Sequence, residues 1–365
     1  MAHMIDETTG VAAIAYVGDS PWHKLGQRLT AGASLEDWRK QAGLGYDVIR
    51  APVQFERLNL SKMFDGDGVS VPTVLTAMPE RHVLYRSDTG KALSVVSKDY
   101  RVVQPGDVLD FFGQLAEIGG FELETAGALS AGRRIWALAK VNDGAPVIGQ
   151  DVVRPYVLLA TSYDGTLATT AKFTAVRVVC NNTLTMSVGA FDASTGRASA
   201  ATETDTVGRA VSSMVRIPHS KTFDAAAVRR DLGIVGNVWD RWLVNTRLMA
   251  ERGMSLQEAD VFAAKLLSSV QAPSRDGRPL SDIRKSKGFG RIMDMFSGSS
   301  LIGGDLTGGQ TRWKMLNAVT QEVDYNRGKS DDTRMQSAWF GAGEGIKNSA
   351  YEMLMSEDKF AYIAA

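Results

Sequence analysis

The residues with the clearest capacity for chemistry follow one apolar stretch near the middle of the chain. Arg177, Cys180, Asn181 and Asn182 close the run that starts at Pro155. An arginine can fork onto phosphate oxygens with two parallel hydrogen bonds, and an asparagine amide can position a polar edge. The cluster is therefore a candidate binding site. In a purely structural alternative, the asparagines form a turn and the cysteine packs as a small apolar residue.

Cys180 is the only cysteine in the chain. As a nucleophile it would need a nearby histidine to lower its pKa, and the sequence places none of the four histidines beside it. One cysteine excludes an intrachain disulfide framework and fits a reducing cytosol. The histidines show no paired spacing that suits zinc. We therefore expect no catalytic residue, no metal and no cofactor.

A second candidate is a basic segment, residues 274–291, which we expect to form a loop and which holds six cations against Asp276 and Asp282. Glycine and serine between the cations would let backbone N–H groups approach phosphate, and Phe289 could stack on a base. The alternative is a solvated surface loop. Together the two candidates predict a nucleic-acid site made of Lys172, Arg177, Asn181, Asn182, Arg284, Lys285, Lys287, Phe289 and Arg291.

Two further patches are better explained by a structural role than by chemistry. Trp22 and His23 lie in an N-terminal arm, and Trp339 lies near the C-terminus; we expect these three residues at a subunit interface, where aromatic side chains act as anchors. A glycine-rich stretch, residues 303–309, precedes an expected helix and could cradle phosphate, but it lacks the lysine of a phosphate-binding loop. A mobile loop is the simpler interpretation of that stretch.

The elements that position these residues indicate an α+β fold. Two apolar runs flank Tyr163-Asp164-Gly165-Thr166, and Asp-Gly is a strong hairpin signal, so residues 155–184 are expected to form a long β-hairpin. Shorter strands and flanking helices surround it in an antiparallel sheet. We divide the chain into an α+β sheet domain with an N-terminal arm, 1–215, and a mainly helical region, 216–365. A segment rich in small residues, 189–220, reads as a linker or loop.

Helix starts are marked by capping residues. Ser34 with acidic residues after it, and Ser255 with Glu258 three positions later, predict two helix N-termini. In the C-terminal region we expect helices from Gln310 to Val323 and from Ala342 to Met355.

The composition is that of an ordinary globular protein. Apolar residues make up 44% of the 365 residues and charged residues 22%. Lysine plus arginine, 41, equals aspartate plus glutamate, 41, so nucleic-acid binding would need a local patch of positive charge. No apolar run approaches about 18 residues, and the N-terminus does not resemble a signal peptide. We expect a cytoplasmic protein that does not enter a membrane.

Five stretches carry a resemblance to a known family. They are residues 21–26, 98–105, 177–184, 317–324 and 337–341, and they span nearly the whole chain in one order. On these motifs the chain resembles the phage/plasmid-like family that carries domain of unknown function 932. Such proteins occur in phages, prophages and plasmids, which implies DNA metabolism, replication or counter-defence. A remoter likeness is to phage single-strand annealing proteins of the RecT, Erf and Red-beta types, which are oligomeric and hold single strands in a basic groove under a β-hairpin.

Three functions remain open at this point. The favoured one is a non-enzymatic, homo-oligomeric recombination protein that binds single-stranded DNA and anneals complementary strands. The second is an assembly or anti-host-defence protein without DNA binding. The third is a metal-dependent enzyme on nucleic acid, for which Asp164, Glu322 and Asp324 could supply carboxylates, although no spacing pairs them.

Overall fold

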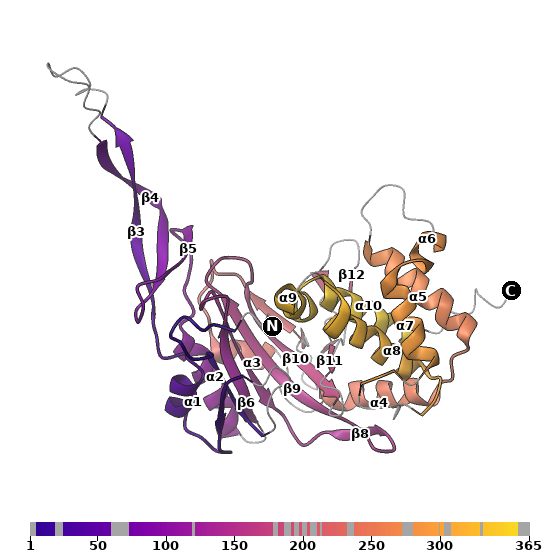
Figure 1. Cartoon of the computed structure of the whole chain (residues 1–365). Coiled ribbons are helices and arrows are strands. Elements are labelled where there is room, and N and C mark those ends of the chain that lie inside the picture. The colour runs from indigo at the N-terminus through magenta and orange to yellow at the C-terminus, as the bar shows by residue number, and fades with distance from the viewer. Residues whose placement is uncertain are drawn as a thin grey trace.

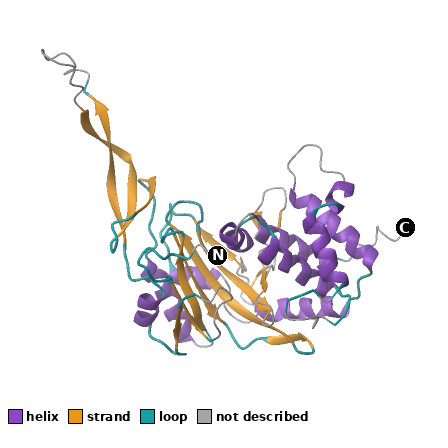
Figure 2. Ribbon diagram, viewed as in Figure 1, coloured by secondary structure: helices purple, strands orange, loops and turns teal. Residues whose placement is uncertain are grey.

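The computed structural model confirms the mixed α+β class, with antiparallel strands first and helices in the C-terminal region (Figures 1 and 2). The residues it describes are 5–18, 25–59, 73–118, 121–177, 182–185, 191–192, 197–198, 203–204, 210–211, 214–231, 237–271, 280–298, 300–302, 308–328 and 331–356.

A large sheet forms the centre of the described chain. Its strand order is β11-β10-β9-β7-β6-β1-β2, with β8 added beside β9 and β16 beside β10. All neighbours are antiparallel except β1 and β2. The strands are β1 (Ile14–Val17), β2 (Gln27–Leu29), β6 (Glu122–Leu129), β7 (Arg134–Lys140), β8 (Ala145–Ile148), β9 (Asp151–Ser162), β10 (Thr169–Arg177), β11 (Asn182–Thr185) and β16 (Met214–Ile217).

The expected long hairpin is present as β9 and β10, which pair from Ala160 opposite Thr170 to Val153 opposite Arg177. Between 189 and 220, where we expected a linker, two short pairs of strands occur before β16. They are β12 (Phe191–Asp192) with β13 (Arg197–Ala198), and β14 (Glu203–Thr204) with β15 (Ala210–Val211).

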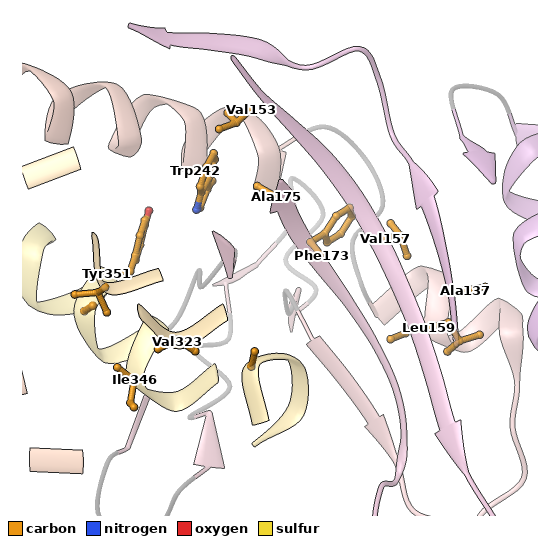
Figure 3. Close-up of a cluster of buried hydrophobic side chains, with 14 of the residues drawn as sticks. Ala137, Val153, Val157, Leu159, Phe173, Ala175, Trp242, Val323, Ile346 and Tyr351 are labelled. Carbon is orange, nitrogen blue, oxygen red and sulfur yellow. The ribbon is translucent and has the colours of Figure 1, made fainter. Parts of the chain in front are cut away.

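Both faces of the large sheet are buried, because its central strands are apolar at nearly every position. In β7, Ala137 belongs to the face that packs on helices α1 (Leu35–Gln41) and α2 (Pro105–Ile118). Trp136 and Leu138 belong to the opposite face, where Trp339 and Phe340 of helix α9 (Asp331–Phe340) pack. Figure 3 shows Ala137, Val157, Leu159 and Phe173 on neighbouring strands, with Trp242 and Tyr351 contributed by the helices.

A separate three-stranded sheet projects from this body as an arm (Figure 1). Its strands are β3 (Val48–Leu58), β4 (Thr73–Arg86) and β5 (Ala92–Ser97), paired antiparallel in that order. Strand β5 pairs only with the inner part of β4, from Arg81 to Tyr85, so the outer part of the arm is a two-stranded ribbon. The sequence predicts a strand from Tyr46 to Phe55, which covers most of β3, and a short one from Val83 to Arg86, so the outer part of β4 was missed.

The C-terminal region is a packed group of helices, and its buried residues form one cluster with those of the sheet. The helices are α3 (Ala225–Asp231), α4 (Asn237–Glu251), α5 (Leu256–Gln271), α6 (Leu280–Arg284), α7 (Lys287–Ser297), α8 (Arg312–Gln321), the π-helical turn η2 (Glu322–Asn326), α9 and α10 (Ala342–Met355). None of the helices in the described ranges has both the length and the apolar character needed to cross a bilayer.

The expectation of a loop up to Arg291 is wrong for its second half, which is helical. Ser286 caps α7 by accepting a hydrogen bond from the Phe289 backbone N–H at 3.2 Å. Phe289, Ile292 and Phe296 then recur at helical spacing and are buried, so α7 is an amphipathic core helix. The apolar spacing is hard to recognise in the sequence because the cations lie between these residues, on the exposed side of α7.

Candidate nucleic-acid interface

In its described part, residues 280–291, the basic segment that the sequence singled out presents little unmatched charge. Arg291 forms a bidentate pair with Glu322, at 2.7 and 2.5 Å, and Arg284 pairs with Asp260 at 2.5 Å. Lys285 lies 3.5 Å from Asp282. Lys287 is exposed at the start of α7. Phosphate binding here would compete with carboxylates already in place, and binding by these residues stays a prediction.

Phe289 and Lys172 are both buried, although the sequence places them in a nucleic-acid site. Phe289 is 7% exposed and packs within the core, so its ring has no open face for a base. Lys172 is 4% exposed on β10, and its ammonium group donates to a Glu344 carboxylate oxygen at 2.5 Å and to the Trp339 carbonyl. Burial lowers the pKa of Lys172, and Glu344 opposes that shift. In this structure Lys172 connects the sheet to helices α9 and α10, whereas Phe289 lies on a helix that packs among other helices.

The remaining predicted residues are only partly described. Trp22, His23, Cys180 and Asn181 lie outside the described residues. Arg177 ends β10 and Asn182 begins β11, where the two residues pair across the strands, and nothing further is described of their side chains. Strand β11 lies against helices α8 and α10. The end of the hairpin and the helices that carry Asn317 and Lys347 are therefore brought together in space.

Buried charge accumulates at this junction of sheet and helices. Lys347 is 3% exposed and its ammonium group lies 2.9 Å from an Asp324 oxygen, on η2. The second Glu344 oxygen lies 4.0 Å from Arg216. Such pairs are expensive to desolvate and are tolerated only when partners are in place. The carboxylates of Glu322 and Asp324, considered above for an enzyme, are thus engaged with Arg291 and Lys347.

The arm carries positive charge that the sequence analysis did not single out. Residues 48–101 contain eight lysines and arginines against six acidic residues, in a chain whose overall charge is balanced. Arg81 and Arg101 are exposed and have no carboxylate partner within the described part of the chain. Arg50 bonds His82 Nδ1 at 3.0 Å and the Lys98 carbonyl. This local excess is the kind of patch that a neutral protein needs in order to bind nucleic acid.

An aromatic stack lies beside these cations at the base of the arm. The rings of Tyr100 and His219 stack with centroids 4.4 Å apart. The Arg101 backbone N–H donates to the His219 carbonyl at 2.5 Å, and the Tyr100 hydroxyl donates to the Ser162 carbonyl at 2.5 Å. The base of the arm is therefore tied to the β9–β10 turn, and Arg101 is held at a fixed place.

A buried arginine fixes the arm to the body on its other side. Arg86 ends β4 and its side chain is 2% exposed; it pairs with Asp6 and forms two bonds with Asp88, at 2.9 and 2.7 Å. Its guanidinium carbon lies 3.9 Å from the centroid of the Tyr46 ring. These bonds from Arg86 lower the pKa of Asp88. At Gly132 a Cβ atom would come within 2.8 Å of the guanidinium, and φ is +83°, so glycine is required there.

The outer ribbon of the arm exposes large apolar side chains on both faces. Phe55, Leu58, Val74, Leu75 and Met78 are between 36% and 64% exposed. A two-stranded ribbon is only marginally stable by itself in water. Exposed apolar groups gathered in this way mark an interaction surface.

A comparison with protein families places the chain. The model of a domain of unknown function (DUF932) matches residues 92–198 and 202–339, which make up most of the sequence. The chain belongs to the DUF932 family. No curated protein and no solved structure matches it. The DUF932 match runs from β5 to Trp339 of α9, so it includes the large sheet and leaves out strands β3 and β4 of the arm.

Proposed function

We propose that this DUF932 protein is a non-enzymatic, phage- or plasmid-encoded protein that binds single-stranded DNA and anneals complementary strands. The observation that carries the proposal is the positive charge of the arm and its base, where exposed Arg81 and Arg101 have no carboxylate partner among the described residues. Phosphate contacts supply most of the affinity of non-specific DNA binding, and a few local contacts are sufficient to hold a strand.

Annealing requires that two like-charged backbones approach each other while their bases stay accessible. Cations at the base of a projecting arm neutralise one backbone locally and leave the rest of the strand uncovered. In an oligomer, arms on neighbouring copies present two strands side by side. No covalent chemistry is needed for this action, and the family resemblance to mobile-element proteins fits it.

The experiment compares two double variants by fluorescence anisotropy of a labelled single strand at several salt concentrations. R81Q/R101Q removes two exposed cations of the arm and its base. The matched control, K285Q/K287Q, removes two exposed cations from the segment that the sequence favoured. Each lost phosphate contact should reduce the slope of log affinity against log salt by about 0.7.

We expect R81Q/R101Q to reduce that slope by about 1.4 and the control to leave it unchanged. The opposite pattern would place the DNA site on α6 and α7 instead of the arm. If the unmodified protein shows no binding at about 50 mM salt and micromolar concentration, where phosphate contacts dominate, the proposal fails.

The apolar ribbon favours a second function, that of an assembly protein of the mobile element. Phe55 and Leu75 are 48% and 64% exposed, and they would be buried in contact with another protein. Sedimentation of the protein without DNA tests this candidate. Concentration-dependent assembly that is lost in F55S/L75S, together with absence of DNA binding, would favour it over the annealing protein.

A further inference from the structure

Strand β4 has an open edge in the outer part of the arm. Strand β3 pairs with β4 on one side. On the other side β5 pairs only with residues 81–85, and the Lys98 N–H then adds one bond to the Glu80 carbonyl, at 3.1 Å. Within the described part of the chain, no strand pairs with residues 73–79 on that side. Backbone N–H and C=O groups at such an edge are a template for a further strand.

This open edge lacks the charges that usually protect an edge strand. Residues 73–79 contain no charged side chain, and the apolar ones among them at positions 74, 75 and 78 are between 36% and 64% exposed. Strand β3, in contrast, carries exposed Arg50, Glu56 and Arg57. Charged side chains on edge strands prevent pairing with other chains. The difference indicates that β4 is the edge suited to pairing.

The uncharged stretch is complementary to a second copy of itself. When two identical strands pair antiparallel about a two-fold axis, one residue lies opposite itself, and residues equally far on either side of it lie opposite each other. Thr76 is the middle residue of the uncharged stretch. With Thr76 at the axis, Val74 of one copy lies opposite Met78 of the other. On the second face of the ribbon, Leu75 lies opposite Ala77. Threonine pairs and apolar pairs of this kind stabilise antiparallel sheets.

Pairing through β4 completes a sheet that the single arm leaves unfinished. Phe55 lies opposite Thr76 and Val53 opposite Met78, so these side chains and Val74 share one face of the ribbon. A two-stranded ribbon is marginally stable in water, whereas three or more strands with an apolar face are stable. Figure 1 shows the outer ribbon extending away from the large sheet and the helices, which leaves this edge accessible.

We propose that a second copy of this chain binds along residues 73–79 of β4, antiparallel and with Thr76 at the two-fold axis, so that two arms form one four-stranded sheet. The inference goes beyond the proposed function and does not depend on DNA binding. It supplies a fixed link between two copies, each of which presents its own arm to a strand of DNA. A strand from a different protein would not share this symmetry, and the experiments therefore test the symmetry itself.

The first experiment is disulfide cross-linking of the full chain under mild oxidation. In T76C the two introduced thiols lie directly opposite each other, with Cβ atoms about 4.5–5.5 Å apart. In the control T73C, each thiol lies opposite Pro79 and six positions from its equivalent, which is about 20 Å at about 3.3 Å per residue. We expect T76C to form covalent dimers and T73C to form no more than the unmodified protein, whose only thiol is Cys180.

The second experiment compares two charge variants by sedimentation. V74E/M78E places glutamates opposite each other at two positions of the paired edge, whereas V74E/M78K places a glutamate opposite a lysine at both. Within one chain these two positions are about 13 Å apart, so the variants differ little as monomers. Since opposite charges across a sheet attract and like charges repel, V74E/M78K should dimerise at least about tenfold more tightly than V74E/M78E.

Three results would overturn the inference. The unmodified protein could remain monomeric at the highest concentration at which it dissolves. T73C could cross-link as strongly as T76C, or T76C could form no covalent dimer. The two charge variants could associate equally, which would place any contact between copies elsewhere. All these measurements are made without DNA, so failure here leaves the DNA-binding test with R81Q/R101Q standing by itself.

Discussion

The buried pair between Lys172 and Glu344 allows a quantitative test of how the sheet and helices are joined. Both side chains are 5% exposed, and they lie 2.5 Å apart across β10 and α10. The perturbation is E344Q, which keeps the shape of the side chain but removes its charge. Lys172 then retains the Trp339 carbonyl as a neutral acceptor and loses its counter-charge.

The expected cost follows from the charges around this site. Removing one partner of a buried pair leaves an uncompensated ion, which typically destabilises by about 3–5 kcal/mol. The lower part of that range applies, because the Trp339 carbonyl remains. K172M should cost less than E344Q, because Arg216 lies 4.0 Å from Glu344 and still opposes its charge. The double variant should cost less than the sum of the two single variants by about 0.5–3 kcal/mol.

The effect should also depend on pH with a definite sign. In the folded protein burial lowers the pKa of Lys172 below its usual value of 10.5, and removal of the Glu344 charge should lower this pKa further. Between that folded pKa and 10.5 the unfolded chain binds the extra proton, so the stability of E344Q should rise with pH relative to the unmodified protein.

The assay is urea unfolding followed by tryptophan fluorescence for both single variants and the double variant. The reasoning is refuted if both single variants cost less than about 1 kcal/mol and their effects add. If K172M instead keeps full stability but loses DNA affinity, Lys172 contacts phosphate as the sequence suggested, and the structural role is wrong.

Two further predictions concern the arm and the helices. D88N should weaken the loss of stability at acid pH. Bonds from Arg86 lower the pKa of Asp88 below 3.8 in the folded protein, so the ionised Asp88 stabilises the fold above pH 3.8, and this stabilisation is lost as the pH falls through the folded pKa. Unfolding midpoints between pH 5 and pH 2 check this, and an unchanged acid limb would contradict it. S255A should lower the free energy of unfolding by about 1 kcal/mol, because the Ser255 hydroxyl accepts from the Glu258 N–H at 3.2 Å; thermal unfolding measures it, with no change in midpoint as the contrary result.

Local sequence signals predicted much of the fold. The capping boxes at Ser34 and Ser255 are present in the structure, and α10 covers Ala342–Met355 as expected. The Asp164–Gly165 turn correctly indicated the β9–β10 hairpin. Such features depend on residues within a few positions of one another, which a single sequence displays directly.

The length of the arm and the burial of charges could not be predicted in the same way. Proline is disfavoured within a strand, but Pro79 lies in a bulge, where the register of β4 against β3 jumps from His82 to Met78. The buried position of Lys172 depends on Glu344, a partner 172 residues away. No local pattern reveals such a partner, so a lysine on a strand was interpreted as a phosphate ligand.

The most direct test of the central claim is the rate at which two complementary strands of about 40 nucleotides pair with and without the protein at low salt. We predict faster duplex formation with the unmodified protein and a rate close to the protein-free value with R81Q/R101Q. Equal rates with and without the unmodified protein, at concentrations that saturate binding, would contradict the account.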